Sequence, residues 1–239
     1  AAENGIAKLR INPGNIGGEA KVRELADCAK RHHIPIRIGV NSGSAEKELL
    51  EKYGGPTAEC LTESALNHAR MLEKAGFQDI VLSMKSSDVR LTVEAYRLAS
   101  RKCDYPLHVG VTEAGLPGQG TVKSAIGIGA LLLDGIGDTI RVSLSGDPVP
   151  EAKAAWDILR ALNIRHRGAQ LIACPTCGRT VIPVAEIAAR VERELEDLEV
   201  PLKVAVMGCV VNGIGEGREA DVGIAGGKSG GALFVKGQE

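Results

Sequence analysis

Ile36-Arg37-Ile38-Gly39-Val40 is a short run that is apolar apart from one cation, and the segments on either side of it, 18–32 and 57–75, carry apolar residues at helical spacing. The alternation of strand-like and helix-like segments continues from residue 8 to about residue 160. The other strand-like runs are 8–11, 80–84, 107–112 and 139–144, and a further helical pattern spans 89–102. Repeated strand–helix units predict a parallel sheet, either doubly wound or closed into a (β/α)8 barrel.

The first part of the chain holds fewer units than a closed barrel needs. A barrel has eight strands and takes about 250 residues, whereas the whole chain has 239 and this part shows five strand-like runs. We therefore expect an α/β fold in which residues 1–165 are the last five strand–helix units of a TIM barrel. The first residue is Ala1 and no helix precedes the first strand, as expected if three opening units are missing.

The pattern restarts after residues 164–168. Residues 166–239 are expected to form a small α+β domain, with strands at 169–173, 202–207, 221–225 and 232–235 and an amphipathic helix at 184–198.

The composition points to a small-molecule partner. Lys and Arg number 29 against 30 Asp and Glu, so no global field favours nucleic acid or a membrane surface. No apolar run approaches the roughly 20 residues that span a bilayer, and no signal pattern opens the chain. The chain is expected to be cytoplasmic.

Three cysteines in the second part are spaced for metal or redox chemistry. Cys174 and Cys177 form a Cys-x-x-Cys pair just past one predicted strand, and Cys209 follows another. A structural zinc site is usually closed by a fourth Cys or His, but neither residue type follows Cys209. Glu216 lies seven residues further on in the glycine-rich run 213–217, where a sharp turn can bring its carboxylate back to the site. Three thiolates plus one replaceable carboxylate suit an iron–sulfur cluster that does chemistry at one iron.

The remaining three cysteines have no such spacing. Cys28, Cys60 and Cys103 are expected to be small, buried apolar residues on helices or at helix ends.

Four of the five strand-like runs in the first part carry a cation at or just past their apolar residues: Arg10, Arg37, Lys85 and Arg141. Parallel strands are normally apolar on both faces, and an unpaired buried charge costs several kcal/mol. Each cation could pair with a neighbouring acid on the rim. Together they favour a receptor for phosphate or carboxylate at the strand ends, where barrel enzymes build their sites.

Two titratable residues lie among these cations. Glu113 follows the fourth run and is a candidate proton donor or hydrogen-bonding partner for a substrate oxygen. His108 lies inside that run, and we expect a buried histidine with satisfied hydrogen bonds rather than a ligand.

Five ordered motifs carry a resemblance to a known family. They are LRINPGNIG at 9–17, PIRIGVN at 35–41, GVTEAG at 110–115, CPTC at 174–177 and GCVVNG at 208–213. They resemble 4-hydroxy-3-methylbut-2-enyl diphosphate synthases, the iron–sulfur enzymes of the non-mevalonate isoprenoid pathway. The similarity covers essentially the whole chain, except that the family's first three strand–helix units and its final helix are missing.

The resemblance implies a TIM barrel joined to a domain with a 4Fe-4S cluster, assembled as a head-to-tail homodimer. It implies reductive opening of 2-C-methyl-D-erythritol 2,4-cyclodiphosphate to 4-hydroxy-3-methylbut-2-enyl diphosphate and water, with two electrons from ferredoxin or flavodoxin. The implied cluster ligands are Cys174, Cys177, Cys209 and Glu216. Asn212 would reach the substrate beside the cluster, and Glu113 would be the acid residue of the barrel. The implied diphosphate ligands are Arg10, Arg37, Lys85, Arg141 and Ser143.

Two other functions compete with this interpretation. A thiol–disulfide enzyme could use Cys174 and Cys177, although it leaves Cys209 and the basic strand ends unexplained. A structural metal module attached to a non-catalytic phosphate-binding barrel is the second alternative. An anaerobic preparation that is brown favours the cluster, and a colourless one containing zinc favours the module.

Overall fold

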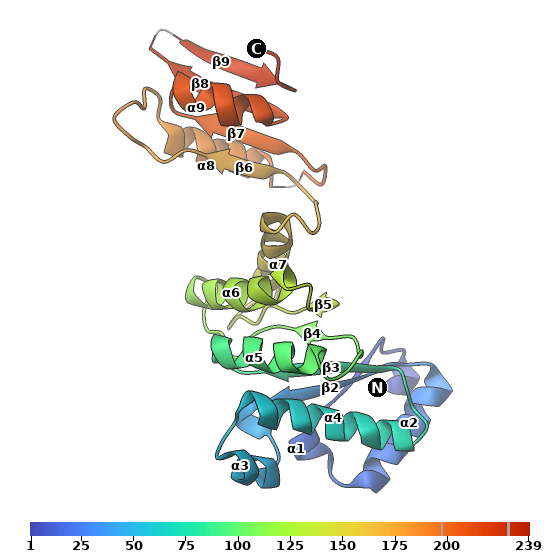
Figure 1. Cartoon of the computed structure of the whole chain (residues 1–239). Helices are drawn as coiled ribbons and strands as arrows, with labels where there is room; N and C mark the ends of the chain where they lie inside the picture. Colours follow the sequence, from blue (N-terminus) through green and yellow to red (C-terminus); the bar gives the residue numbers. More distant parts are fainter. Residues whose placement is uncertain (197, 229) are drawn as a thin grey trace. The chain divides into compact units, whose positions relative to one another are not determined.

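The computed structural model describes residues 1–196, 198–228 and 230–239. It divides into two compact units, Ala1–Ile158 and Leu159–Glu239 (Figure 1). The sequence predicted a boundary at 165/166, and the helix that spans the division, α7, covers Val149–Ala161. No helix in these described ranges combines the length and apolar character needed to cross a membrane.

Five parallel strands of the first unit follow the order predicted from the sequence. Strands β1, β2 and β3 form one ladder in that order, β4 and β5 form a second, and a bridge from Leu82 to Leu107 connects β3 to the segment before β4. The strands cover Leu9–Ile11, Ile36–Asn41, Ile80–Lys85, His108–Val109 and Thr139–Ile140. The parallel α/β arrangement agrees with the prediction.

The fourth and fifth strands are shorter than the sequence predicted. The runs 107–112 and 139–144 were expected to be strands throughout, yet β4 and β5 have two residues each. For β4, one cause is Tyr96, whose hydroxyl accepts a hydrogen bond from Met84 N–H (3.1 Å) and donates to the carbonyl of His108 (2.6 Å). Backbone groups that would pair β3 with β4 are thereby bound by a side chain.

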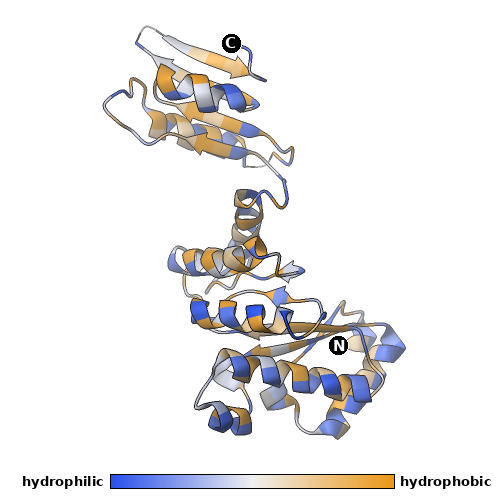
Figure 2. Ribbon diagram, viewed as in Figure 1, coloured by the Kyte–Doolittle hydropathy of each residue, from blue (hydrophilic) through white to orange (hydrophobic). Residues whose placement is uncertain are grey.

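Helices cover the apolar side of these strands. Helices α4 and α5 pack against β2 and β3, and Ile36, Ile38, Val40 and Leu82 are fully buried. Thr57 and Asp88 cap α4 and α5, since their side chains accept from the N–H groups of Cys60 and Leu91. Figure 2 shows polar and apolar faces on these helices. The helices are α1 Pro13–Ile16, α2 Glu19–His32, α3 Lys47–Tyr53, α4 Ala58–Lys74, α5 Val89–Ser100 and α6 Gln119–Leu133, with short 3-10 turns at Ala2–Asn4 (η1) and Ser42–Ser44 (η2).

The second unit is a four-stranded sheet with strand order β6-β7-β8-β9, in which only the last pair is antiparallel. Its core contains Ala205, Met207, Ala225 and Phe234, against which Ile172 and Cys174 pack. The elements are β6 Gln170–Ala173, α8 Val184–Glu194, β7 Lys203–Met207, α9 Val210–Asn212, η3 Gly213–Gly217, β8 Val222–Gly227 and β9 Gly230–Val235. Helix α8 ends earlier than the predicted helix 184–198, of which residue 197 lies outside the described residues.

The glycine-rich run has a different conformation from the one expected. Instead of a sharp turn, Gly213–Gly217 forms one wide helical turn that continues from α9. Its glycines allow close packing, because a Cβ at Gly213 would lie 2.1 Å from the Cβ of Ala225 on β8. The run therefore lies directly on the sheet that carries the cysteines.

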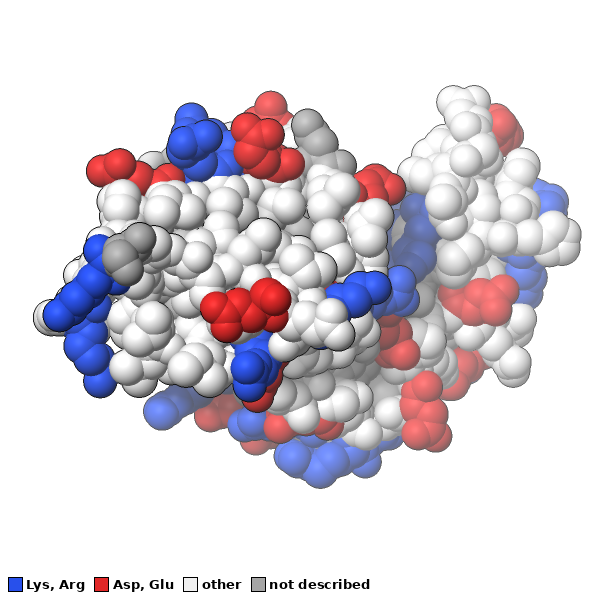
Figure 3. All heavy atoms as spheres, turned by 90° about the horizontal axis from the view of Figure 1, so that it is seen from above, with Lys and Arg blue, Asp and Glu red and all other residues white. Residues whose placement is uncertain are grey.

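Acidic and basic side chains are interspersed over the face shown in Figure 3. This agrees with the balanced composition of 29 basic and 30 acidic residues.

Candidate active site

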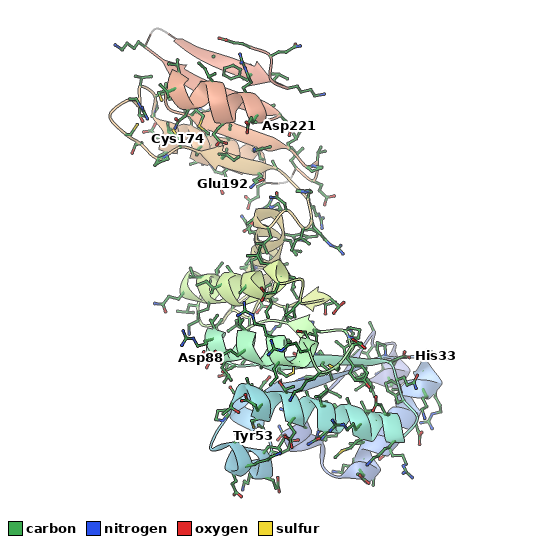
Figure 4. The ribbon with its side chains drawn as sticks, viewed as in Figure 1. His33, Tyr53, Asp88, Cys174, Glu192 and Asp221 are labelled. Carbon is green, nitrogen blue, oxygen red and sulfur yellow. The ribbon has the colours of Figure 1, made fainter. Side chains whose placement is uncertain are left out.

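Two of the three clustered cysteines lie at the ends of neighbouring parallel strands. Cys174 directly follows β6, and Cys209 follows β7 after one intervening glycine. The N–H of that glycine, Gly208, donates to the sulfur of Cys174 at 3.1 Å. In Figure 4, Cys174 lies at one end of the sheet and Asp221 at the other. The sheet thus brings the Cys174 thiol next to the residue that precedes Cys209.

Gly208 also fixes the loop that carries Cys177. Its carbonyl accepts from the N–H of Val181 (2.9 Å), and a Cβ at this position would lie 2.8 Å from side-chain carbons of Thr180 and Val184. Any larger residue would push the loop away. The segment after Cys177 is therefore held against the end of β7 by a position that only glycine fits.

The thiol of Cys177 is exposed and ionises more readily than an ordinary cysteine thiol. Hydrogen bonding from the backbone N–H of Arg179, and then from the Thr180 hydroxyl, lowers the pKa of Cys177 below its ordinary value. The hydroxyl oxygen of Thr180 also accepts from Cys177 N–H at 3.0 Å. Because the thiolate is the form that binds metal, this loop presents a ready ligand.

Asn212 and Glu216 lie just beyond Cys209 and are both exposed. Within the residues that the structure describes, no Lys or Arg forms an ion pair with Glu216, so its carboxylate is available to a ligand. Large apolar side chains next to these positions in the sequence are also exposed: Val210, Val211 and Ile214.

The donor set is chemically suited to an iron–sulfur cluster, whose usual ligands are cysteine thiolates. Across 1–196, 198–228 and 230–239, no three His, Cys, Asp or Glu side chains converge closely enough to hold one metal ion. A four-iron cluster has no such requirement, because each donor binds a different iron. Three thiols at one end of the sheet, with backbone N–H groups directed at two of the sulfurs, have the chemistry that such a cluster needs.

The cations of the first unit share one face of the strands. Arg10 pairs in register with Arg37, and Lys85 pairs with Asn41, which lies four residues after Arg37 on the same strand. Residues in register, and those an even number apart on a strand, face the same side. This face is opposite to the apolar side that the helices cover.

Two glycines leave room for these cations. A Cβ at Gly39 would lie 2.6 Å from Nε of Arg10, whose Nη2 donates to the Gly39 carbonyl at 3.1 Å. A Cβ at Gly110 would lie 2.3 Å from the carbonyl oxygen of Arg141 and 3.3 Å from Nζ of Lys85. The side chains of Arg10 and Lys85 therefore occupy space that a side chain at Gly39 or Gly110 would fill.

Most of the positive charge on these strands has no acidic partner. Arg141 lies 3.6 Å from a carboxylate oxygen of Glu151. In the described part of the chain, Arg10, Arg37 and Lys85 form no ion pair with Asp or Glu. Rim pairing, the alternative raised by the sequence, therefore accounts for only one of the four cations.

Burial and mutual repulsion weaken the charge of Lys85. Its side chain is 5% exposed, and its pKa falls to about 7, mainly through burial and then through Arg37, Arg141 and Arg10. Burial, with Arg10 and Arg141, also lowers the pKa of Arg37. A bound anion would relieve this repulsion and restore the proton on Lys85.

We expect the ligand-free protein to become more stable as pH rises above about 7. The folded-state pKa of Lys85 lies below its ordinary value of 10.5, so between these values the unfolded chain binds more protons. Urea unfolding at about pH 7 and about pH 9 measures the change. Lys85→Met should flatten this dependence, and an equal slope in parent and variant would contradict the assignment.

Glu113 and Ser143 lie in the connections after β4 and β5. Glu113 is exposed and has φ of 51°, a left-handed conformation that is uncommon for a residue with a side chain. Such strain is found at functional sites. Ser143 is partly buried two residues after Arg141.

Sequence reasoning missed the bonding of His108. The ring was expected to have satisfied hydrogen bonds, and its Nδ1 does lie 2.8 Å from the hydroxyl oxygen of Thr139. Its Nε2 is buried without any partner, which contradicts the expectation. Tyr96, which binds the carbonyl of His108, was not singled out because a lone tyrosine in a helical pattern carries no signal.

Known protein families match both units of the chain. A family model described as the GcpE TIM-barrel domain matches residues 1–156, and one described as the GcpE protein C-terminal domain matches residues 170–239. Two similar proteins are named 4-hydroxy-3-methylbut-2-en-1-yl diphosphate synthase (flavodoxin). That of Caldanaerobacter subterraneus subsp. tengcongensis is 61% identical over 99% of this chain and 66% of its own length. That of Clostridium perfringens is 59% identical over 100% of this chain and 68% of its own length. The chain thus spans about two thirds of the length of these relatives.

Proposed function

The chain belongs to the GcpE family, and we propose that it carries the substrate and cluster sites of an enzyme that forms 4-hydroxy-3-methylbut-2-enyl diphosphate. The substrate would be 2-C-methyl-D-erythritol 2,4-cyclodiphosphate, opened reductively with loss of water. The observation that carries the proposal is the row of cations on one strand face, three of which have no acid partner among the described residues. A diphosphate supplies the charge that this face lacks.

The cationic side chains would bind and orient the diphosphate. Arg10, Arg37 and Arg141 can each give two parallel hydrogen bonds to phosphate oxygens, and Lys85 contributes a point charge. The hydroxyl of Ser143 would donate to a phosphate oxygen. The Glu113 carboxyl would hold the proton that lets a substrate oxygen leave as water.

The second unit would supply the electrons. Cys174, Cys177, Cys209 and Glu216 are the residues that would hold a 4Fe-4S cluster, which when bound provides single electrons and a Lewis-acidic iron. Glu216 would be the weakest of the four ligands, because a carboxylate is displaced more easily than a thiolate, and its position would be the one open to substrate. The amide of Asn212, in the helical turn after Cys209, would hydrogen-bond the substrate beside it.

We propose flavodoxin as the electron donor, in line with the names of the relatives, and keep ferredoxin as an alternative.

Turnover by full-length protein tests the proposal. Anaerobic, cluster-loaded enzyme with chemically reduced flavodoxin should consume the cyclic diphosphate and release the linear diphosphate, as followed by phosphorus NMR. Turnover with ferredoxin but not flavodoxin would correct the donor alone, whereas no consumption with either would refute the proposal. Sedimentation of the same preparation tests the implied head-to-tail homodimer, which an active monomer would contradict.

A further inference from the structure

Two buried nitrogens on the cationic strand face have no hydrogen-bond partner: Arg37 Nε and His108 Nε2. Only one other buried side-chain atom in the described residues shares this condition, Ser124 Oγ. A buried polar group without a partner destabilises the folded protein, because it has lost its hydrogen bonds to water. The first two atoms are complementary, because Nε–H of an arginine can only donate and an imidazole nitrogen can accept.

The charges around His108 decide which of its ring nitrogens accepts. Burial, followed by Lys85, Arg37, Lys8 and Arg141, lowers the pKa of His108 to about 3, so the ring is neutral. A neutral imidazole has one N–H and one lone pair. Surrounding cations favour the lone pair on the nitrogen that faces them.

The contact of the ring with Thr139 is compatible with the matching tautomer. Nδ1 lies 2.8 Å from Thr139 Oγ1 and can donate its hydrogen there, which leaves the lone pair on Nε2. The fully buried Tyr96 hydroxyl donates to the backbone carbonyl of His108 at 2.6 Å and fixes the strand beneath the ring. His108 is thus anchored at its backbone and at Nδ1, with Nε2 as a free acceptor.

Arg37 is placed to meet this acceptor. It lies on β2, two strands away from His108, on the face that Arg10 and Lys85 share. Between them lies β3, where the bridge from Leu82 to Leu107 sets Ser83 beside His108. On β3, Val81 is level with Arg37 and Ser83 is level with Gly39, so the arginine side chain would reach His108 diagonally, beside the short serine. The charge of Arg37 also acts on the Tyr96 phenol, whose oxygen is bonded to His108.

We propose that His108 is a positioning residue for Arg37. Its Nε2 accepts the Arg37 Nε–H when the guanidinium turns toward a bound diphosphate. The four N–H bonds on the terminal nitrogens of Arg37 then remain for phosphate oxygens. The inference rests on the proposed function, because the diphosphate is the ligand that Arg37 would face.

Two substitutions at His108 separate the two ring nitrogens. In His108→Asn, the amide keeps the contact with Thr139 but does not extend to Arg37. In His108→Gln, the amide oxygen reaches the place of Nε2 and can accept from Arg37. Titration calorimetry of full-length, cluster-loaded protein with inorganic pyrophosphate should show about tenfold weaker binding for His108→Asn. His108→Gln should recover most of the affinity, and His32→Asn at the exposed end of α2 should match the parent.

A double-mutant cycle shows whether His108 acts through Arg37. Arg37→Lys keeps the charge and removes the Nε–H donor, so His108→Asn should weaken pyrophosphate binding no further in that background. The same loss in both backgrounds would overturn the inference, as would parent-like binding by His108→Asn. Either result leaves the proposed function intact, whereas a parent protein that fails to bind pyrophosphate would overturn both.

Discussion

Replacing Cys174, Cys177 or Cys209 with serine should remove iron and acid-labile sulfide from anaerobically reconstituted protein. Serine is a far weaker iron ligand, and each of these residues lies at or near the end of β6 or β7. The parent should hold about four irons and four sulfides per chain. Because all three thiols would bind the same cluster, each single replacement should be enough to lose most of it.

The other three cysteines are matched controls for this experiment. Cys60 is fully buried in α4, and burial raises the pKa of Cys60 and of Cys103. Cys28 lies within α2. Serine at any of the three should leave iron and sulfide contents unchanged. Stoichiometric zinc without sulfide in the parent would refute the cluster, and equal iron loss from controls and test variants would mean that folding is being measured.

The sequence was informative where the position of a residue on a strand follows from the apolar residues around it. Arg10 and Arg37 could be assigned to parallel strands because apolar residues flank them, and the ladder pairs them in register. Cys174 and Cys209 could be expected near each other because both follow apolar runs, and β6 and β7 are neighbours in the sheet. Local pattern was sufficient in these cases because parallel strands place their ends together.

Contacts between residues far apart in the chain could not be predicted from the sequence. The hydroxyl of Tyr96 shortens the pairing of β3 with β4, a result that depends on where α5 lies on the sheet. The unsatisfied Nε2 of His108 depends equally on its neighbours. The turn at Gly213–Gly217 was misjudged because its glycines relieve close packing, for example of Gly213 against Ala225, rather than supply positive φ. Glycine permits both a sharp turn and a helical turn, and packing against β8 decided which of the two Gly213–Gly217 adopts.

Glu216→Cys should keep the cluster of the full-length protein and abolish its turnover. Glu216 is exposed, has no ion-pair partner among the described residues, and lies on a turn packed against β8. A cysteine there can still bind the fourth iron, but a thiolate is harder to displace than a carboxylate, so substrate would lose access to that iron. Iron and sulfide analysis alongside turnover measures both effects.

Glu113→Gln is the matched comparison, because Glu113 lies in the first unit, whereas Cys174, Cys177 and Cys209 lie in the second. Its amide can hydrogen-bond the substrate but cannot supply a proton, so kcat should fall by about 100-fold or more while the iron content and pyrophosphate affinity stay at parent values. The two carboxylates should therefore fail differently, Glu216 through access to the iron and Glu113 through proton transfer. Parent-like turnover by Glu216→Cys would rule out an exchangeable ligand at this position, because a cysteine there would then be as good a fourth ligand as the carboxylate.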